Sequence, residues 1–174
     1  MVYKRVILKR GKEESLKRFH PWVFSGAIAR MDNIEEGDLV TVYDHEGNLI
    51  GNGHYQIGSI AVRILTFDDT EIDSAFFVKR LTEAYKMRQA LGLSRPDNNA
   101  FRLVHGEGDF LPGLVVDIYG STAVMQAHSP GMHFARNLIA DALTQLPNGV
   151  VKNVYYKSET TLPYKAQLDP QNEY

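Results

Sequence analysis

The first 70 or so residues alternate short β-branched segments with turn sequences, and this alternation limits the possible folds more than any other feature of the chain. Glu36-Gly37-Asp38 and Asp44 to Asn48 are turn sequences between apolar segments. Five or so short strands in about 70 residues, with frequent glycines, predict a small closed or partly closed β-barrel. The expected strands cover residues 4–9, 23–28 (interrupted at Ser25-Gly26), 39–43, 49–55 and 59–67.

The pattern becomes helical after Asp68 to Glu71, which predicts a domain boundary. Asp73 or Ser74 can cap a helix that Gly92 ends. We therefore expect a mixed α/β fold in two small domains, with a barrel in residues 1–69 and an α+β domain in residues 70–174. The expected buried positions of this helix are Phe77, Leu81, Ala84, Tyr85 and Leu91.

The rest of the second domain is predicted to contain several strands and one further helix. Residues 101–104 form a strand, and residues 114–119 and 122–126 form a hairpin joined at Gly120-Ser121. Ser129-Pro130 begins the second helix, and residues 150–156 form the last strand. The tail from residue 157 onward is polar and has no clear period. The expected buried stripe of the second helix is Phe134, Ala135, Leu138, Ala142 and Leu146.

Composition narrows the chemistry that this chain can perform. Apolar residues make up 44% and charged residues 23%, which is typical of a globular core and argues against global disorder. The chain has no cysteine, which excludes disulfides, thiolate metal sites and a cysteine nucleophile within it. Its apolar runs are too short for a membrane span, and its first residues lack a signal-peptide core. We expect a soluble cytoplasmic protein.

The net charge of -2 hides an asymmetry between the start of the chain and the remainder. Residues 1–30 contain eight basic and two acidic side chains, which gives +6, whereas the other 144 residues sum to -8. Concentrated basic charge is typical of a surface that binds phosphate groups. The alternative interpretation is a solvated face that happens to be basic.

The segment from Arg18 to Ile28 combines aromatic and basic side chains. It contains Trp22, the single tryptophan of the chain, beside Phe19 and Phe24, and it follows Lys17. In proteins that bind single-stranded RNA, aromatic rings stack on bases while cations contact phosphates. The alternative is that Trp22 and Phe24 are core side chains, because large aromatic residues dominate small cores.

The loop from Gly106 to Gly113 is the other segment where chemistry is conceivable. Glu107 and Asp109 lie two residues apart, and His105, His128 and His133 could join them around a metal ion. Their spacing matches no zinc pattern, and loop carboxylates more often bind turn amides. The chain has no Walker loop, dinucleotide fingerprint or H-E-x-x-H motif. We predict no catalytic residues and no metal site, and a small-molecule or metal enzyme built on this loop is an open alternative.

Two segments together resemble a known family. R-F-H-P-W-V-F-S-G-A-I at 18–28 is similar to the opening signature of the PUA-type domain in bacterial SAM-dependent 23S rRNA cytosine-5 methyltransferases. F-R-L-V-H-G-E-G-D-F-L-P-G-L-V-V-D-I-Y at 101–119 is similar to the stretch that follows that domain. In that family an RNA-binding β-barrel and an α+β linker domain precede a Rossmann-like SAM-binding domain.

The resemblance implies that this chain is the RNA-binding and linker portion of such an enzyme. Its tail from about residue 158 would lead toward a methyltransferase domain that these residues do not include. Cytosine-5 methylation needs a thiolate nucleophile, and the chain has no cysteine, so we expect no activity from it alone. S-adenosylmethionine is implied for the full-length protein and no cofactor for this chain.

The resemblance also suggests residues and partners. Ribosomal RNA is the implied partner, a homodimer is a further expectation, and a free-standing RNA-binding adaptor without activity is the alternative function. The basic residues would contact phosphates without reading sequence. The residues expected to face RNA are Lys9, Arg10, Lys12, Lys17, Arg18, His20, Trp22, Ser25 and Gly26, with Tyr55 and Arg63 flanking them.

Overall fold

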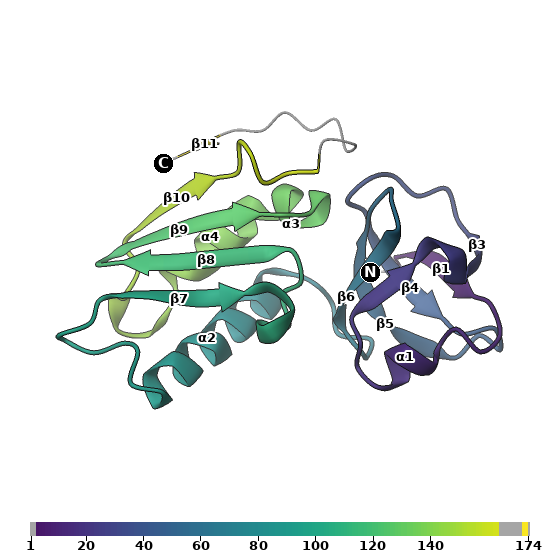
Figure 1. The fold of residues 1–174 in the computed structure, drawn as a ribbon, viewed down its shortest axis with the longest axis horizontal. Helices are drawn as coiled ribbons and strands as arrows, with labels where there is room; N and C mark the ends of the chain where they lie inside the picture. Colours follow the sequence, from purple (N-terminus) through teal and green to yellow (C-terminus); the bar gives the residue numbers. More distant parts are fainter. Residues whose placement is uncertain (1–2, 164–171, 174) are drawn as a thin grey trace.

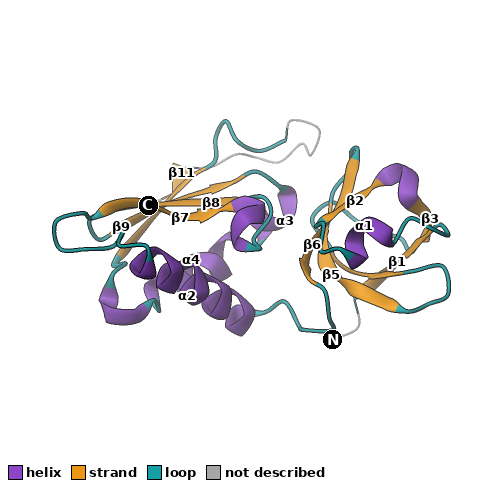
Figure 2. Cartoon of the chain, turned by 60° about the horizontal axis from the view of Figure 1, so that its bottom comes forward, coloured by secondary structure: helices purple, strands orange, loops and turns teal. Residues whose placement is uncertain are grey.

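The chain folds around two β-sheets, each with its own hydrophobic core (Figure 1). The structure, a computed structural model, describes residues 3–163 and the backbone of residues 172–173. A six-stranded sheet in the order β2-β6-β5-β4-β1-β3 forms the N-terminal domain, and a five-stranded sheet in the order β11-β10-β9-β8-β7 forms the second domain. The helices α2 and α4 cover one face of the second sheet (Figure 2). The mixed α/β fold expected from the sequence is confirmed.

The N-terminal sheet curls, and its two edge strands, β2 and β3, are consecutive in the chain. Strand β1 pairs in parallel with β4 and antiparallel with β3, so the chain start lies between two later strands. The sheet is therefore an open half-barrel, as the spacing of the strands predicts. Its elements are β1 (Lys4–Leu8), α1 (Glu14–Lys17), β2 (Trp22–Phe24), the 3₁₀ turn η1 (Ser25–Ala27), β3 (Ile28–Met31), β4 (Leu39–Tyr43), β5 (Leu49–Tyr55) and β6 (Ile60–Thr66).

The second domain begins with the helix that the sequence predicts. Asp73 caps it by accepting the backbone N–H of Phe76 at 2.9 Å, and Gly92 follows its end with φ of +68°. The elements of the domain are α2 (Ser74–Ala90), β7 (Ala100–His105), the 3₁₀ turn η2 (Gly106–Asp109), β8 (Leu114–Tyr119), β9 (Thr122–Ala127), α3 (Pro130–Phe134), α4 (Arg136–Thr144), the 3₁₀ turn η3 (Pro147–Gly149), β10 (Asn153–Lys157) and β11 (Asn172–Glu173).

The second predicted helix differs from the expectation because it is interrupted at Ala135. The break separates α3 from α4, and only part of the expected stripe is buried. Ala142 and Leu146 are buried as expected, whereas Phe134 and Leu138 are 54% and 43% exposed. Ile139 and Leu143 are fully buried in addition. Two other expectations are also wrong. Leu91 lies beyond the end of α2 and is exposed, and the last strand begins at Asn153 instead of Val150. Most of the tail lies outside the described residues.

The two domains touch through close glycine contacts. Gly131 at the start of α3 lies against the ring of His54 on β5, and a Cβ built on Gly131 would be 2.1 Å from His54 Cγ. Gly37 meets the ring of Phe134 in the same manner, which explains why Phe134 leaves the core of its own domain. The backbone N–H of Ile72 also donates to the Tyr3 hydroxyl at 2.9 Å. The interdomain packing therefore depends on side-chain size at two glycines.

Replacing Gly131 with alanine is expected to destabilise the chain by about 1–3 kcal/mol, because the added methyl group overpacks a site that the buried His54 ring already fills. The free energy of unfolding from urea titration measures this effect. Gly108→Ala is the matched control, because a Cβ at Gly108 would meet no atom within 4 Å. Equal stability of the two variants would contradict the close interdomain contact.

Within residues 3–163, none of the helices has the length and apolar character that a membrane span requires. No group of three or more histidine, aspartate or glutamate side chains in residues 3–163 is placed to hold a metal ion.

Candidate nucleic-acid interface

A groove on the N-terminal domain collects several of the residues that the sequence indicates. It has a volume of about 340 Å³ and is built from α1, β2 and η1. We call it the front groove. Its lining residues are Lys12, Ser15, Leu16, Trp22, Val23, Phe24, Gly26 and Ala27.

The aromatic side chains of β2 face this groove and do not belong to the core. Val23 is buried in the barrel, so its neighbours Trp22 and Phe24 point to the other face of the strand. Trp22 is half-buried and Phe24 is 49% exposed, with their ring centroids 6.4 Å apart and nearly perpendicular. The core interpretation of these two residues is therefore wrong. Both rings are open to a partner on the groove side.

The turn η1 forms an open end of the groove. The Lys9 ammonium donates to the Gly26 carbonyl at 2.9 Å, which holds a lysine beside the turn. The backbone N–H of Ser25 donates to the Ser59 carbonyl at 2.9 Å and fixes the turn to the start of β6. A Cβ on Gly26 would meet no atom within 4 Å, so a ligand can approach the backbone there.

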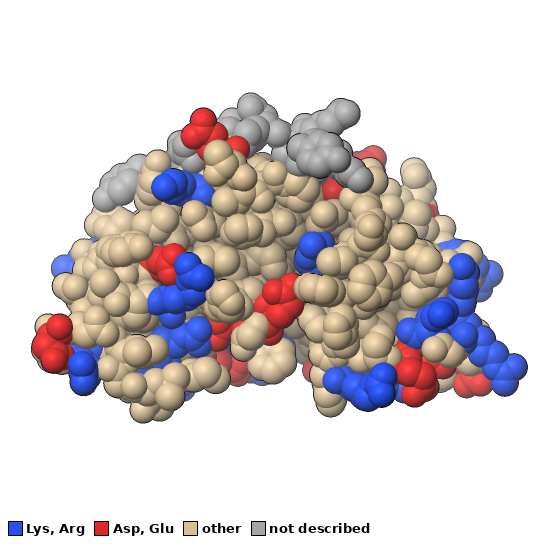
Figure 3. All heavy atoms as spheres, in the orientation of Figure 1, with Lys and Arg blue, Asp and Glu red and all other residues tan. Residues whose placement is uncertain are grey.

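The basic side chains of the first 30 residues divide into paired and unpaired groups. Lys4 is neutralised by Asp38 at 2.7 Å, Arg5 lies 3.6 Å from Asp32, and Lys17 lies within 4 Å of Glu13 and Glu14. The space-filling view shows basic and acidic side chains together over the outer end of the N-terminal domain (Figure 3). The cations that form no ion pair within the described part of the chain are Lys9, Arg10, Lys12, Arg18 and Arg30.

The structure brings together part of the predicted RNA-facing set. Lys9, Lys12, Trp22, Ser25 and Gly26 surround the front groove. His20 supports this arrangement: its Nδ1 accepts the backbone N–H of Trp22 at 3.3 Å, and its ring meets the indole edge-on at 5.4 Å. Arg10, Lys17 and Arg18 are exposed nearby, but they do not line the groove. Tyr55 instead packs against the barrel core.

Arg63 is the register partner of Trp22 in the pairing of β2 and β6, so the two side chains lie on the same face of the sheet. It lines a second cavity, of about 260 Å³, which we call the seam cavity because both domains contribute to it. Burial lowers the pKa of the Arg63 guanidinium, and the nearby Glu107 carboxylate opposes this shift. The residues around the seam cavity are Arg63, His105, Gly106, Glu107, Gly113, Leu114, Val115 and His128.

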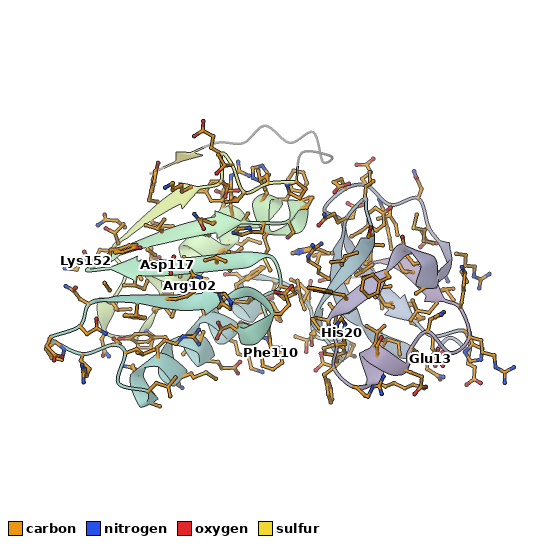
Figure 4. All side chains as sticks on the ribbon, viewed as in Figure 1. Glu13, His20, Arg102, Phe110, Asp117 and Lys152 are labelled. Carbon is orange, nitrogen blue, oxygen red and sulfur yellow. The ribbon has the colours of Figure 1, made fainter. Side chains whose placement is uncertain are left out.

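The loop after β7 has a role that the sequence does not reveal. Its Glu107 carboxylate accepts the indole N–H of Trp22 at 2.9 Å, which joins residues 85 positions apart. His20 and Phe110 lie on opposite sides of this domain boundary (Figure 4). Asp109, by contrast, is buried in an ion pair with Arg88. The two acids have separate partners, so they do not form a catalytic carboxylate pair.

The comparisons with known proteins agree with this architecture. Residues 6–67 match the family model described as a PUA-like domain. A ribosomal RNA large subunit methyltransferase I from Escherichia coli is 41% identical over 145 residues, which are 82% of this chain and 36% of that protein. The protein of the same name from Citrobacter koseri is 38% identical over 169 residues, which are 95% of this chain and 42% of that protein.

Solved structures share the fold across both domains. A protein from Streptococcus mutans, for which a SAM-dependent methyltransferase activity has been proposed, superposes with a TM-score of 0.77. The alignment covers 100% of this chain and 43% of that one at 17% identity, so it shows the fold alone. The chain spans 36% of the length of the Escherichia coli relative and 42% of the length of the Citrobacter koseri relative. It thus contains a PUA-like domain and is homologous to the ribosomal RNA large subunit methyltransferase I proteins.

Proposed function

We propose that this chain is the RNA-binding and linker portion of a SAM-dependent rRNA cytosine-5 methyltransferase. In this proposal the front groove binds ribosomal RNA, and the second domain connects the groove to a catalytic domain outside these 174 residues. The relatives named as ribosomal RNA methyltransferases, together with the PUA-like domain, support the RNA part of the proposal.

The observation that carries the proposal is the composition of the front groove. Trp22 and Phe24 expose rings on which unpaired bases can stack, and Lys9 and Lys12 place unpaired cations beside them. Aromatic faces together with cations bind single-stranded nucleic acid with little dependence on base sequence. The front groove is therefore suited to binding RNA, but its groups provide little basis for selecting a particular base.

The described residues do not fit S-adenosylmethionine. The unit β9-α3-α4-β10 pairs its strands in parallel, and the start of its first helix is where a cofactor would be expected. At that helix start the His54 ring lies directly against Gly131, in the position that a ligand would have to occupy. The chain also lacks the cysteine that cytosine-5 chemistry requires. We therefore assign both the cofactor site and the nucleophile to the catalytic domain.

The double variant Lys9→Ala/Lys12→Ala tests the groove. It is expected to weaken binding of single-stranded rRNA fragments about ten- to a hundredfold, because charge-assisted contacts to phosphates are lost. The slope of log K against log salt should fall in magnitude by about 1.4, since two phosphate contacts to a single strand no longer release counterions. Fluorescence anisotropy of labelled RNA at several salt concentrations measures both quantities.

Lys79→Ala/Lys86→Ala on α2 is the matched control, because it removes the same charge from exposed positions of the second domain. It should leave the affinity within about twofold of the original chain. Equal losses in the two double variants would show that general charge, and not the front groove, binds the RNA.

A further inference from the structure

The front groove and the seam cavity are connected through one residue, Trp22. Trp22 lines the groove, and its indole N–H donates to Glu107, which lines the cavity. Arg63, also in the cavity lining, is the register partner of Trp22 on the adjacent strand. A strand of RNA that stacks on the groove side of Trp22 therefore has the seam cavity within reach of its next nucleotide.

The cavity has the size and mixture of groups that suit a single base. Its volume of about 260 Å³ is below the range of about 300–1,000 Å³ that is typical for drug-sized ligands, so it suits a fragment as small as one nucleobase. Leu114 and Val115 provide the apolar wall, and a Cβ built on Gly106 would meet only the Leu114 carbonyl oxygen, at 3.9 Å, so the backbone there is open. The polar groups are a guanidinium, a carboxylate and two imidazoles.

The carboxylate determines which ligand chemistry fits. One oxygen of Glu107 accepts the Trp22 indole N–H, and the other has no hydrogen-bond partner among the described residues. A carboxylate repels phosphate and accepts N–H donors, as it does from the exocyclic amino group of cytosine in nucleic-acid recognition. Arg63 donates to Gln56 and has further N–H groups for a phosphate or a base carbonyl.

We propose that the seam cavity binds one unstacked nucleobase that carries an exocyclic amino group, with Glu107 accepting an amino N–H and Arg63 contacting the adjacent phosphate or a base carbonyl. The inference rests on the proposed function, because the front groove delivers the strand. Uracil has no amino group, so the cavity discriminates against it. The cavity thereby supplies base selectivity, which a stacking groove does not provide.

Short single-stranded oligonucleotides test the inference on the 174-residue chain. Oligocytidine is expected to bind about tenfold or more tightly than oligouridine of equal length, as measured by anisotropy. In Glu107→Gln this preference should fall to about twofold or less, while the salt slope stays unchanged because no phosphate contact is lost. The amide oxygen of glutamine can still accept the Trp22 indole N–H, so the variant keeps the hydrogen bond between residues 22 and 107.

Two further variants complete the design. Arg63→Gln should weaken binding of both oligonucleotides. A fall of about 0.7 in the magnitude of the salt slope assigns Arg63 to a phosphate, and an unchanged slope assigns it to a base carbonyl. Glu83→Gln, which removes the same charge from an exposed position on α2, should change neither affinity nor preference. The emission of Trp22, the single tryptophan, reports occupancy locally and should differ between the original chain and Glu107→Gln on oligocytidine addition.

The possible outcomes separate this inference from the proposed function. An unchanged preference for cytidine in Glu107→Gln, with RNA binding still dependent on Lys9 and Lys12, overturns the cavity assignment and leaves the groove intact. The absence of any RNA binding by the original chain overturns the proposed function and the inference with it. Cytidine monophosphate binding as tightly as the oligonucleotide assigns the cavity to a free nucleotide, and so overturns delivery by the groove.

Discussion

Replacing Asp109 with alanine is expected to destabilise the second domain by about 3–5 kcal/mol, because the change leaves the Arg88 guanidinium buried without a counter-charge. The side chains of Arg88 and Asp109 are only 10% and 3% exposed. Arg88 donates to both carboxylate oxygens of Asp109, one of them at 2.7 Å. Asp109 also accepts the backbone N–H of His105 at 2.6 Å, so it anchors the loop that carries Glu107.

A second Arg–Asp pair in the same sheet provides the matched control. Arg102 and Asp117 lie on the neighbouring strands β7 and β8 (Figure 4), and Arg102 donates to both oxygens of Asp117 at 2.8 and 3.0 Å. Their side chains are 47% and 23% exposed, so solvent screens the interaction. Asp117→Ala should therefore cost no more than about 1 kcal/mol. Urea unfolding followed by circular dichroism gives the unfolding free energy of the two variants. Similar losses in Asp109→Ala and Asp117→Ala would contradict the expectation that burial makes the first ion pair the more important one.

The stability of the chain is expected to fall by about 3 kcal/mol between pH 6.5 and pH 4 because of His54 alone. Burial, and to a smaller extent the Arg63 charge, lowers the pKa of His54 from 6.5 to about 4. In this pH window the unfolded chain binds a proton at His54 and the folded chain does not. Protonation therefore favours unfolding, and the contribution of His54 is lost as the pH falls toward the folded-state pKa.

His54→Gln isolates this effect. Carboxyl groups also titrate as the pH falls, but their contribution is common to both proteins and cancels in the difference between the two stability curves. The unfolding free energy of the original chain should decline toward that of the variant, or below it, as the pH is lowered from 7 to 4.5. Parallel curves would mean that His54 keeps its ordinary pKa in the folded chain.

Much of the fold follows from signals that act over a few residues. Asp73 caps α2 and Gly92 follows its end, and the hairpin of β8 and β9 turns at Gly120-Ser121, all as the sequence predicts. Such signals depend on local backbone preferences, which the neighbouring sequence carries. The exposure of Phe134 follows instead from its contact with Gly37 of the other domain, which no local sequence signal indicates.

The candidate site was only partly predictable for the same reason. The sequence alone determined that cations and aromatic rings are concentrated near the start of the chain, and that no cysteine is available for chemistry. Only the tertiary structure decided that Asp38 neutralises Lys4 across 34 positions while Lys12 stays unpaired, and that Trp22 reaches Glu107 across 85. These contacts join positions that have no local relation, because their distance is set by the packing of two domains and not by spacing along the chain.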